Sequence, residues 1–324
     1  MFKLILLIAA VIFFALNMGA SGIAPAFAAS FGGKIIKRKK AVILFGLFVV
    51  CGALVLGSRV SATLGKGLLP AGILNSKTAL VILASAGVSL FISNLLKIPQ
   101  STSQVTVAAI SGAGLYYQQL NLKALFFKII PMWIILPALA YLLTFFLYRV
   151  IYPPRHGNLR LYEKLFAHEK KLKVSALVIS CYVAFAIGSN NVANAVGPLF
   201  GAGVIGLLPG LLLVAPFFGL GGWWMGEGNL KTAGKKIVPL GIFSSNLVSF
   251  VTATLLLVAS GMGVPQSLVQ LNMLSILAIS TLKNGHRDTL GMYVTKKTFL
   301  IWVTAPLLAT IVSFSLLFLA EKIF

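Results

Sequence analysis

The sequence predicts an all-α polytopic membrane protein built from two inverted-topology repeats. Of its 324 residues, 59% are hydrophobic, and the mean hydropathy of +0.99 is far above what one soluble core needs. Several apolar runs approach the twenty residues that a helix needs to cross a bilayer. Short blocks of sequence also recur in the same order in the two halves. The formal net charge of +22 therefore belongs to short loops between spans and does not indicate a nucleic-acid partner.

The spans follow one another with short loops between them. We expect eight spans at apolar runs near 4–16, 41–57, 79–96, 129–148, 174–187, 205–224, 237–259 and 299–318. Two weaker and more polar segments, 100–117 and 266–281, either cross the membrane, which gives five crossings in each half, or form re-entrant hairpins. The first run has signal-like charge but no clear cleavage site, so we expect it to be retained as a span.

A polar connection divides the chain into two repeats. We place the first repeat at 1–152, a cytoplasmic connecting loop at 153–173 and the second repeat at 174–324. Three blocks align between them: NMGASGIAPAF (17–27) with NNVANAVGPLF (190–200), PQSTSQ (99–104) with PQSLVQ (265–270), and WIILPALA (133–140) with WVTAPLLA (302–309). Their nearly constant offsets of 173, 166 and 169 residues predict a structural repeat. We interpret the two tryptophan blocks as residues of the membrane interface.

The orientation follows from the crossing number and the basic residues. An odd number of crossings in each half inverts the second repeat relative to the first, an arrangement that many secondary transporters use. With the N-terminus outside, most of the 27 lysines and arginines fall in cytoplasmic loops. We therefore predict a multi-pass protein of the prokaryotic cytoplasmic (inner) membrane, in contact with lipid, with its N-terminus outside.

Polar residues concentrate in the repeated blocks. Asn190 and Asn194 are four residues apart, as are Asn17 and Ser21, so each pair shares one helix face. Glycines and a following proline flank both pairs, which predicts helices broken at mid-membrane depth around a cavity. A single polar pair often only binds membrane helices together, but four blocks in symmetric positions favour a functional site.

The PQSTSQ and PQSLVQ blocks predict two helix N-termini. With proline at the first helical position, the next three amides have no partner within the helix. These amides belong to Gln100, Ser101 and Thr102 in the first repeat and to Gln266, Ser267 and Leu268 in the second. Each N-terminus carries about half a positive charge, so two of them brought together suit a small oxyanion.

The charge inventory narrows the choice of oxyanion. All five acidic residues fall in or next to predicted loops, so the polar blocks are neutral: Glu163, Glu169, Glu227, Asp288 and Glu321. Phosphate at neutral pH carries a proton and benefits from an acceptor, whereas a carboxylate would repel sulfate. A donor-rich site without carboxylates therefore favours sulfate. No cluster of cysteines or other ligands predicts a metal or a cofactor.

Two motifs resemble a known family. GSNNVANAVGP resembles the G-A-N-D-V-A-N-A signature of the inorganic phosphate transporter (PiT) family, and KIPQSTSQ is similar to its P-V-S-T-T-H hairpin motif. The resemblance covers nearly the whole chain. It implies an all-helical, cation-coupled homodimer of inverted repeats with a tetrahedral oxyanion at the repeat interface.

Two departures separate this chain from the phosphate carriers of the family. The signature aspartate corresponds to Asn191 and Met18, and the motif histidine corresponds to Gln104 and Gln270. The first block is similar to the sulfate permease (CysP-like) branch. The resemblance and the helix-end argument together assign substrate binding to Asn17, Ser21, Asn190, Asn191, Asn194, Gln100, Ser101, Thr102, Ser103, Gln104, Gln266, Ser267 and Gln270.

The sequence thus predicts a secondary active transporter that imports sulfate by alternating access. Proton coupling is expected because a dianion entering a negative interior needs compensating positive charge, and no sodium-site carboxylate is evident. A phosphate transporter of the same family and a passive anion channel stay open as alternatives. An intramembrane enzyme is disfavoured because the sequence has neither H-E-x-x-H nor G-x-S-x-G.

Overall fold

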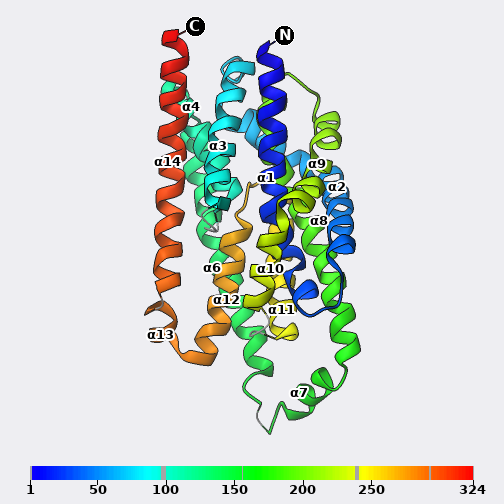
Figure 1. Cartoon of the computed structure of the whole chain (residues 1–324). Coiled ribbons are helices and arrows are strands. Elements are labelled where there is room, and N and C mark those ends of the chain that lie inside the picture. The colour runs from blue at the N-terminus through cyan, green and yellow to red at the C-terminus, as the bar shows by residue number, and fades with distance from the viewer. Residues whose placement is uncertain (1, 96–99, 155, 238–240, 292, 324) are drawn as a thin grey trace.

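The computed structural model describes residues 2–95, 100–154, 156–237, 241–291 and 293–323, and every regular element in them is a helix. The two ends of the chain lie at one end of a long bundle, and α7 lies at the other (Figure 1). The α-helices are α1 (Phe2–Gly32), α2 (Arg38–Ala62), α3 (Ser76–Leu95), α4 (Thr102–Tyr116), α5 (Leu122–Ala124), α6 (Ile130–Ile151), α7 (Leu159–Phe166), α8 (Glu169–Gly201), α9 (Leu207–Trp224), α10 (Gly226–Ile237), α11 (Ile242–Gly261), α12 (Leu268–Asn284), α13 (His286–Gly291) and α14 (Tyr293–Ile323). Two π-helical turns, Thr63–Gly67 and Leu125–Ile129, extend α2 and precede α6.

Eight helical segments of the described residues are long and apolar enough to cross a membrane. They are Lys3–Gly32, Arg38–Gly67, Ser76–Leu95, Leu122–Ile151, Glu169–Gly201, Leu207–Trp224, Ile242–Gly261 and Phe299–Lys322. These segments confirm the eight apolar runs of the sequence. The run predicted at 237–259 includes 238–240, which lie outside the described residues, and α8 begins at Glu169, before the position at which the second repeat was placed.

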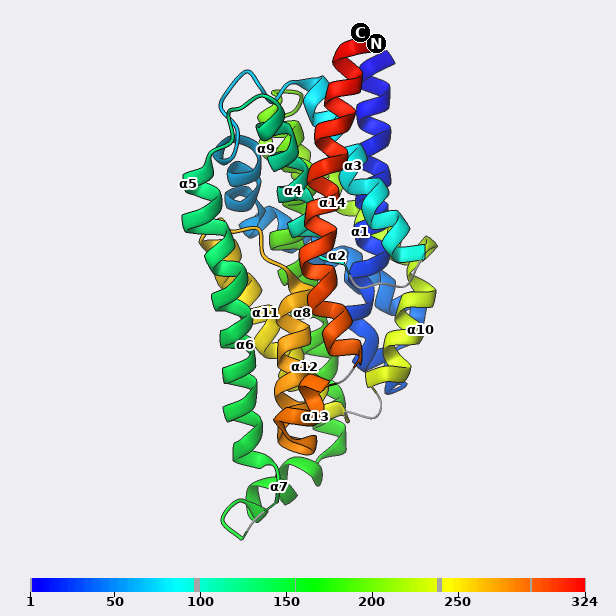
Figure 2. The same ribbon diagram turned by 90° about the vertical axis from the view of Figure 1, so that its left-hand side faces the viewer.

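The two polar segments form the second arms of two hairpins. α4 has 15 residues and α12 has 17, so at ~1.5 Å per residue they reach ~22 and ~26 Å, less than the ~30 Å of a bilayer core. We call α3 with α4 the first hairpin and α11 with α12 the second hairpin. α4 runs from the middle of the bundle toward the chain ends, whereas α12 runs toward α7 (Figure 2). These lengths and directions favour re-entrant hairpins over full crossings. Inversion of the repeats requires such opposite directions, and it stays a prediction.

The asparagine blocks do not break their helices, so that prediction was wrong. α1 is continuous through 17–27 and α8 is continuous through 190–200. The flanking glycines allow close packing instead. A Cβ built on Gly188 would lie 2.0 Å from the carbonyl oxygen of Val49, and one built on Gly19 would lie 2.1 Å from that of Phe218. The helices therefore stay intact while their backbones touch those of neighbouring helices.

The glycine contacts pair helices from different halves of the chain. A Cβ on Gly52 of α2 would lie 1.9 Å from the carbonyl oxygen of Phe185 of α8, and one on Gly221 of α9 would lie 2.0 Å from that of Leu16 of α1. No side chain larger than hydrogen fits at either position. Each asparagine-bearing helix is therefore packed against a helix of the opposite half, α8 against α2 and α1 against α9.

The helices that carry the tryptophan blocks support the second arms of the hairpins. Ser275 of α12 donates a hydrogen bond to the carbonyl oxygen of Ala140 on α6 at 3.4 Å. Thr310 of α14 donates one to the carbonyl oxygen of Ala108 on α4 at 3.1 Å. The hairpin arms α12 and α4 thus pack on α6 and α14 respectively, in matching arrangements.

Candidate functional site

The middle of α8 lies between the two hairpins and contacts both. Each residue from Gly188 to Leu199 is buried, including three asparagines whose amides need partners in a water-poor interior. Asn190 and Asn194 face different hairpins, although they are four residues apart. This turn of α8 is therefore the point at which the two hairpins and a membrane-spanning helix meet.

Asn190 holds the tip of the second hairpin. Its Nδ2 donates to Ser260 Oγ and to the carbonyl oxygen of Val264, both at 3.0 Å, and its Oδ1 accepts from the backbone N–H of Gln266 at 2.9 Å. These bonds use both N–H groups of the Asn190 side chain. Asn190 therefore positions the hairpin and has no free donor to offer an anion in this structure.

Asn194 contacts the start of the first hairpin's second arm. Its Nδ2 lies 3.2 Å from Ser103 Oγ and 3.4 Å from Thr102 Oγ1. Both hydroxyls lie in the first turn of α4, next to main-chain amides that the helix itself cannot bond. The predicted residues of α8 and of the first hairpin are thus brought together.

The helices of the two hairpins begin at serine and not at proline. Ser101 caps α4 by accepting from the N–H of Gln104 at 3.2 Å, and Ser267 caps α12 by accepting from the N–H of Gln270 at 3.2 Å. Pro265 precedes the cap residue Ser267 and lies outside the helix. A serine at the cap gives an unpaired N–H of the first turn a hydrogen-bond partner, whereas proline at the first helical position only removes one N–H. The prediction of proline at the first helical position was wrong for α12, and Pro99 lies outside the described residues.

Unpaired amide groups occur on α8 and at the start of the second hairpin's second arm. Of ten buried side-chain polar atoms without a hydrogen-bond partner in the described residues, five belong to the repeated polar blocks. They are Asn191 Oδ1, Asn194 Oδ1, Gln270 Oε1, and both Oε1 and Nε2 of Gln266. All four side chains are at most 8% exposed. Each buried unpaired polar atom costs about 1–3 kcal/mol, so their concentration here indicates a place where a polar ligand binds.

The residues of the first repeat are paired within the protein. Asn17 donates to the carbonyl oxygen of Phe13 at 2.8 Å, and Ser21 bonds the carbonyl oxygens of Asn17 and Met18 in its own helix. Gln100 donates to Ser89 Oγ at 2.9 Å and accepts from Ser93. These three predicted residues belong to the repeated blocks, but their hydrogen bonds do not involve the residues that carry the unpaired amides.

The site contains no carboxylate, because all five acidic residues are placed elsewhere. Glu163, Glu169, Asp288 and Glu321 are exposed. Glu227 on α10 bonds Arg38 at 2.7 Å and Lys231 at 2.6 Å. The hydrogen bond from Lys231 and the charge of Arg38 hold the pKa of the Glu227 carboxyl below its usual value. The buried polar cluster is therefore neutral.

This arrangement suits a ligand that accepts hydrogen bonds and carries negative charge. The N-terminal amides of α4 and α12 supply partial positive charge, and the neighbouring hydroxyls supply further donors. Rotating a side-chain amide by 180° exchanges its oxygen for its NH₂ group, so Asn191, Asn194, Gln266 and Gln270 can each offer donors as well as acceptors.

The sequence alone did not identify several residues that shape the site. Trp133, interpreted as an interface residue, donates its indole N–H to the carbonyl oxygen of Pro265 at 2.8 Å. Arg59 donates to the carbonyl oxygen of Gly261 at 2.6 Å. The repetition of the tryptophan block could have drawn attention to Trp133. The sequence of a membrane span, however, does not show which loop its side chains contact.

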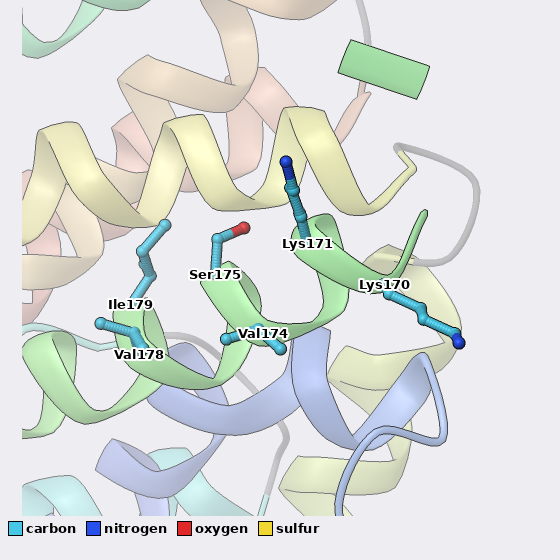
Figure 3. Close-up of a pocket in the computed structure, with 6 residues that line it drawn as sticks. All are labelled: Lys170, Lys171, Val174, Ser175, Val178 and Ile179. Atoms are coloured by element: carbon cyan, nitrogen blue, oxygen red, sulfur yellow. The ribbon is translucent and has the colours of Figure 1, made fainter. Parts of the chain in front are cut away.

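A hollow of about 470 Å³ lies elsewhere, on the outer side of α8 near its start (Figure 3). It is lined by Lys170, Lys171, Val174, Ser175, Val178 and Ile179. Val174 and Val178 are 63% and 62% exposed, as expected for side chains that face lipid. The asparagine cluster begins 11 residues further along the helix, about 16 Å away, so this hollow is separate from the site.

Comparison with known proteins places the chain among anion permeases. The phosphate transporter family matches residues 18–313. The chain is similar to the sulfate permease CysP of Bacillus subtilis (strain 168), with 35% identity over 96% of this chain and 86% of that protein. A putative phosphate permease of Thermococcus kodakarensis is 23% identical over 92% of this chain and 93% of its own. The solved structure of a sodium-dependent phosphate transporter has the same fold, with a TM-score of 0.85, 22% identity and full coverage of both chains.

Proposed function

The chain belongs to the phosphate transporter family, and from this premise we propose that it is a secondary active transporter that imports sulfate. The observation that carries the proposal is the cluster of buried, unpaired amide groups between α8 and the starts of α4 and α12. A dianion there would meet helix N-termini and amide donors and no carboxylate. The similarity to a sulfate permease supports the choice of sulfate.

Substrate contacts are proposed for the unpaired residues first. Asn191, Asn194, Gln266 and Gln270 have buried polar atoms without partners. The hydroxyls and amides at the start of each hairpin helix complete the set, with Ser101, Thr102, Ser103, Gln104 and Ser267. Asn17, Ser21, Asn190 and Gln100 would act by positioning these groups in the state described here.

Proton coupling follows from the charge that must move. Each elementary charge that crosses a potential of 100 mV costs ~2.3 kcal/mol, so a dianion entering a negative interior needs ~4.6 kcal/mol at that potential or compensating cations. We propose symport with protons in a homodimer of the cytoplasmic membrane, with the N-terminus outside. Alternating access would follow from movement of helices around the central site.

Phosphate is the second candidate, and a specific observation favours it. Three of the unpaired atoms, on Asn191, Asn194 and Gln270, are oxygens that can accept a hydrogen bond. The proton of monohydrogen phosphate would satisfy one of them. The similarity to a phosphate permease and to a phosphate transporter of known structure points the same way.

Uptake of radiolabelled sulfate into proteoliposomes tests the proposal. An inward proton gradient should drive concentrative uptake that saturates, and excess unlabelled sulfate should block it more strongly than excess phosphate. Equal block by phosphate would assign the chain to phosphate transport. Uptake that only dissipates a sulfate gradient would indicate a channel.

Asn191→Asp tests the argument from charge. A carboxylate at this buried position would repel sulfate, so we expect at least tenfold lower uptake at pH 7 and partial recovery at acid pH, where the aspartate is protonated. Asn284→Asp is the matched control, because Asn284 is exposed at the end of α12. Unchanged sulfate uptake by the Asn191 variant would show that the missing carboxylate does not determine the substrate.

A further inference from the structure

The tip of the second hairpin is held by side chains from three other helices. Residues 263–267 are buried, so their main-chain groups need partners from the protein. Besides Asn190 of α8, Arg59 of α2 binds the carbonyl oxygen of Gly261, and Trp133 of α6 binds that of Pro265 at 2.8 Å. Trp133 thus bonds the residue directly before Gln266, whose buried side chain has no hydrogen-bond partner among the described residues.

The position of Trp133 follows from the packing of α6 on α12. These helices run in the same direction (Figures 1 and 2) and meet where Ser275 bonds Ala140. Seven residues back from Ala140 is Trp133, and seven residues back from Ser275 is Leu268, the first residue of α12. At ~1.5 Å per residue both lie about 10 Å from the contact, level with each other.

Trp302 occupies the corresponding position beside the first hairpin. α14 and α4 also run in the same direction and meet where Thr310 bonds Ala108. Eight residues back from these positions are Trp302 and Gln100. Trp302 is therefore level with the start of α4, but its indole Nε1 is buried and has no hydrogen-bond partner within the part of the chain that the structure describes. The same block, W-x-x-x-P-x-L-A, thus has a used donor in one half and an unused donor in the other.

We propose that the two tryptophans act in alternation during transport. In the state described here Trp133 holds the second hairpin, and the indole N–H of Trp302 bonds none of the described residues. In the opposite state Trp302 donates to a main-chain carbonyl at the start of α4, and Trp133 releases Pro265. The proposal rests on the proposed function, because it assigns the two indoles to the two states of an alternating-access cycle. Trp133 and Trp302 are positioning residues, since neither is required to touch the substrate.

The expected effect is a shift between two states. One net hydrogen bond changes an equilibrium about fivefold. Trp133→Phe removes a bond of the present state and favours the opposite state, whereas Trp302→Phe removes a bond of the opposite state and favours the present one. Phenylalanine keeps most of the ring packing, so each change removes mainly the N–H donor.

Half-saturating sulfate concentrations on the two faces of the membrane report this shift. The apparent affinity for sulfate on one face of the membrane is proportional to the fraction of protein open to that face, so it decreases when that fraction decreases. Right-side-out and inside-out vesicles should therefore give a ratio of the two concentrations that moves about fivefold in one direction for Trp133→Phe and about fivefold in the other for Trp302→Phe. The double variant should return close to the wild-type ratio. Trp223→Phe is the control, because Trp223 is 61% exposed.

Some outcomes would overturn the alternation. Shifts of both single variants in the same direction, no shift in either, or a double variant displaced further than both would contradict it. Absence of sulfate uptake in the wild type would contradict the proposed function instead. Hydrogen exchange of the backbone N–H groups of residues 262–264, 266 and 267 then tests the alternation without substrate. Trp133→Phe should speed this exchange about fivefold, and Trp302→Phe should not; equal acceleration by both would overturn the proposal.

Discussion

The two hairpins have the same polar block and the same serine cap, but their glutamines have opposite environments. Gln100 of the first hairpin bonds Ser89 and Ser93 of α3, whereas both amide atoms of Gln266 in the second hairpin are buried without a partner among the described residues. Equivalence in sequence therefore does not give equivalence in role. The glutamine of the second hairpin has groups free for a ligand, whereas Gln100 of the first is bonded to serines of α3.

The largest difference in the free energy of unfolding is expected between variants of the two asparagines that contact the hairpins. Asn190→Leu leaves the N–H of Gln266, the carbonyl of Val264 and the hydroxyl of Ser260 with fewer partners, and we expect a loss of about 3 kcal/mol in the free energy of unfolding. Thermal unfolding of the purified protein in detergent measures this loss as a lower Tm.

Asn17→Leu is the matched change in the first repeat. Asn17 bonds a carbonyl of its own helix and meets Asn94 only at 3.3–3.4 Å, so we expect a loss of about 1 kcal/mol. Equal losses in the two variants would show that the asymmetry between the hairpins does not extend to the helices that support them.

The glutamines should respond with opposite signs. Gln266→Leu removes two buried unpaired atoms and should raise the free energy of unfolding by about 1–3 kcal/mol, while sulfate uptake falls at least tenfold. Gln100→Leu leaves Ser89 and Ser93 with fewer partners and should lower it by about 1–2 kcal/mol. Thermal unfolding and uptake on the same preparations separate these effects. A lower Tm for both variants would contradict the assignment of Gln266 to the ligand.

The serine caps should differ least. Ser101 and Ser267 each accept from the N–H three residues further on, at 3.2 Å in both cases. Replacing either by alanine should cost about 1 kcal/mol, as at other helix N-termini. The two Tm values should agree. A clear difference would mean that one serine stabilises more of the structure than the first turn of its own helix.

The sequence predicted much of the fold, and some residues of its predicted site lie together in the structure. The eight apolar runs located the spans, since length and hydropathy are properties of the chain alone. The repeated blocks contain the polar residues through which α8 contacts the hairpins. Asn194 does meet Thr102 and Ser103, and Gln266 and Gln270 do have unpaired atoms.

Other features depended on contacts between distant segments. The glycines beside the asparagines suggested helix breaks, but in α8 Gly188 touches the backbone of α2 and the helix continues. Local composition cannot distinguish a glycine that frees the backbone from one that admits a neighbour. Likewise, nothing in the block around Trp133 shows that its indole reaches Pro265.

The glycine contacts between α2 and α8 also determine how much variation this protein tolerates. A Cβ on Gly52, Gly188 or Gly201 would lie between 1.9 and 2.2 Å from a carbonyl oxygen of the facing helix. Glycine and alanine codons differ by a single nucleotide, so the smallest change that the genetic code permits pushes two helices apart here. Substitutions should therefore accumulate most slowly on these helix faces.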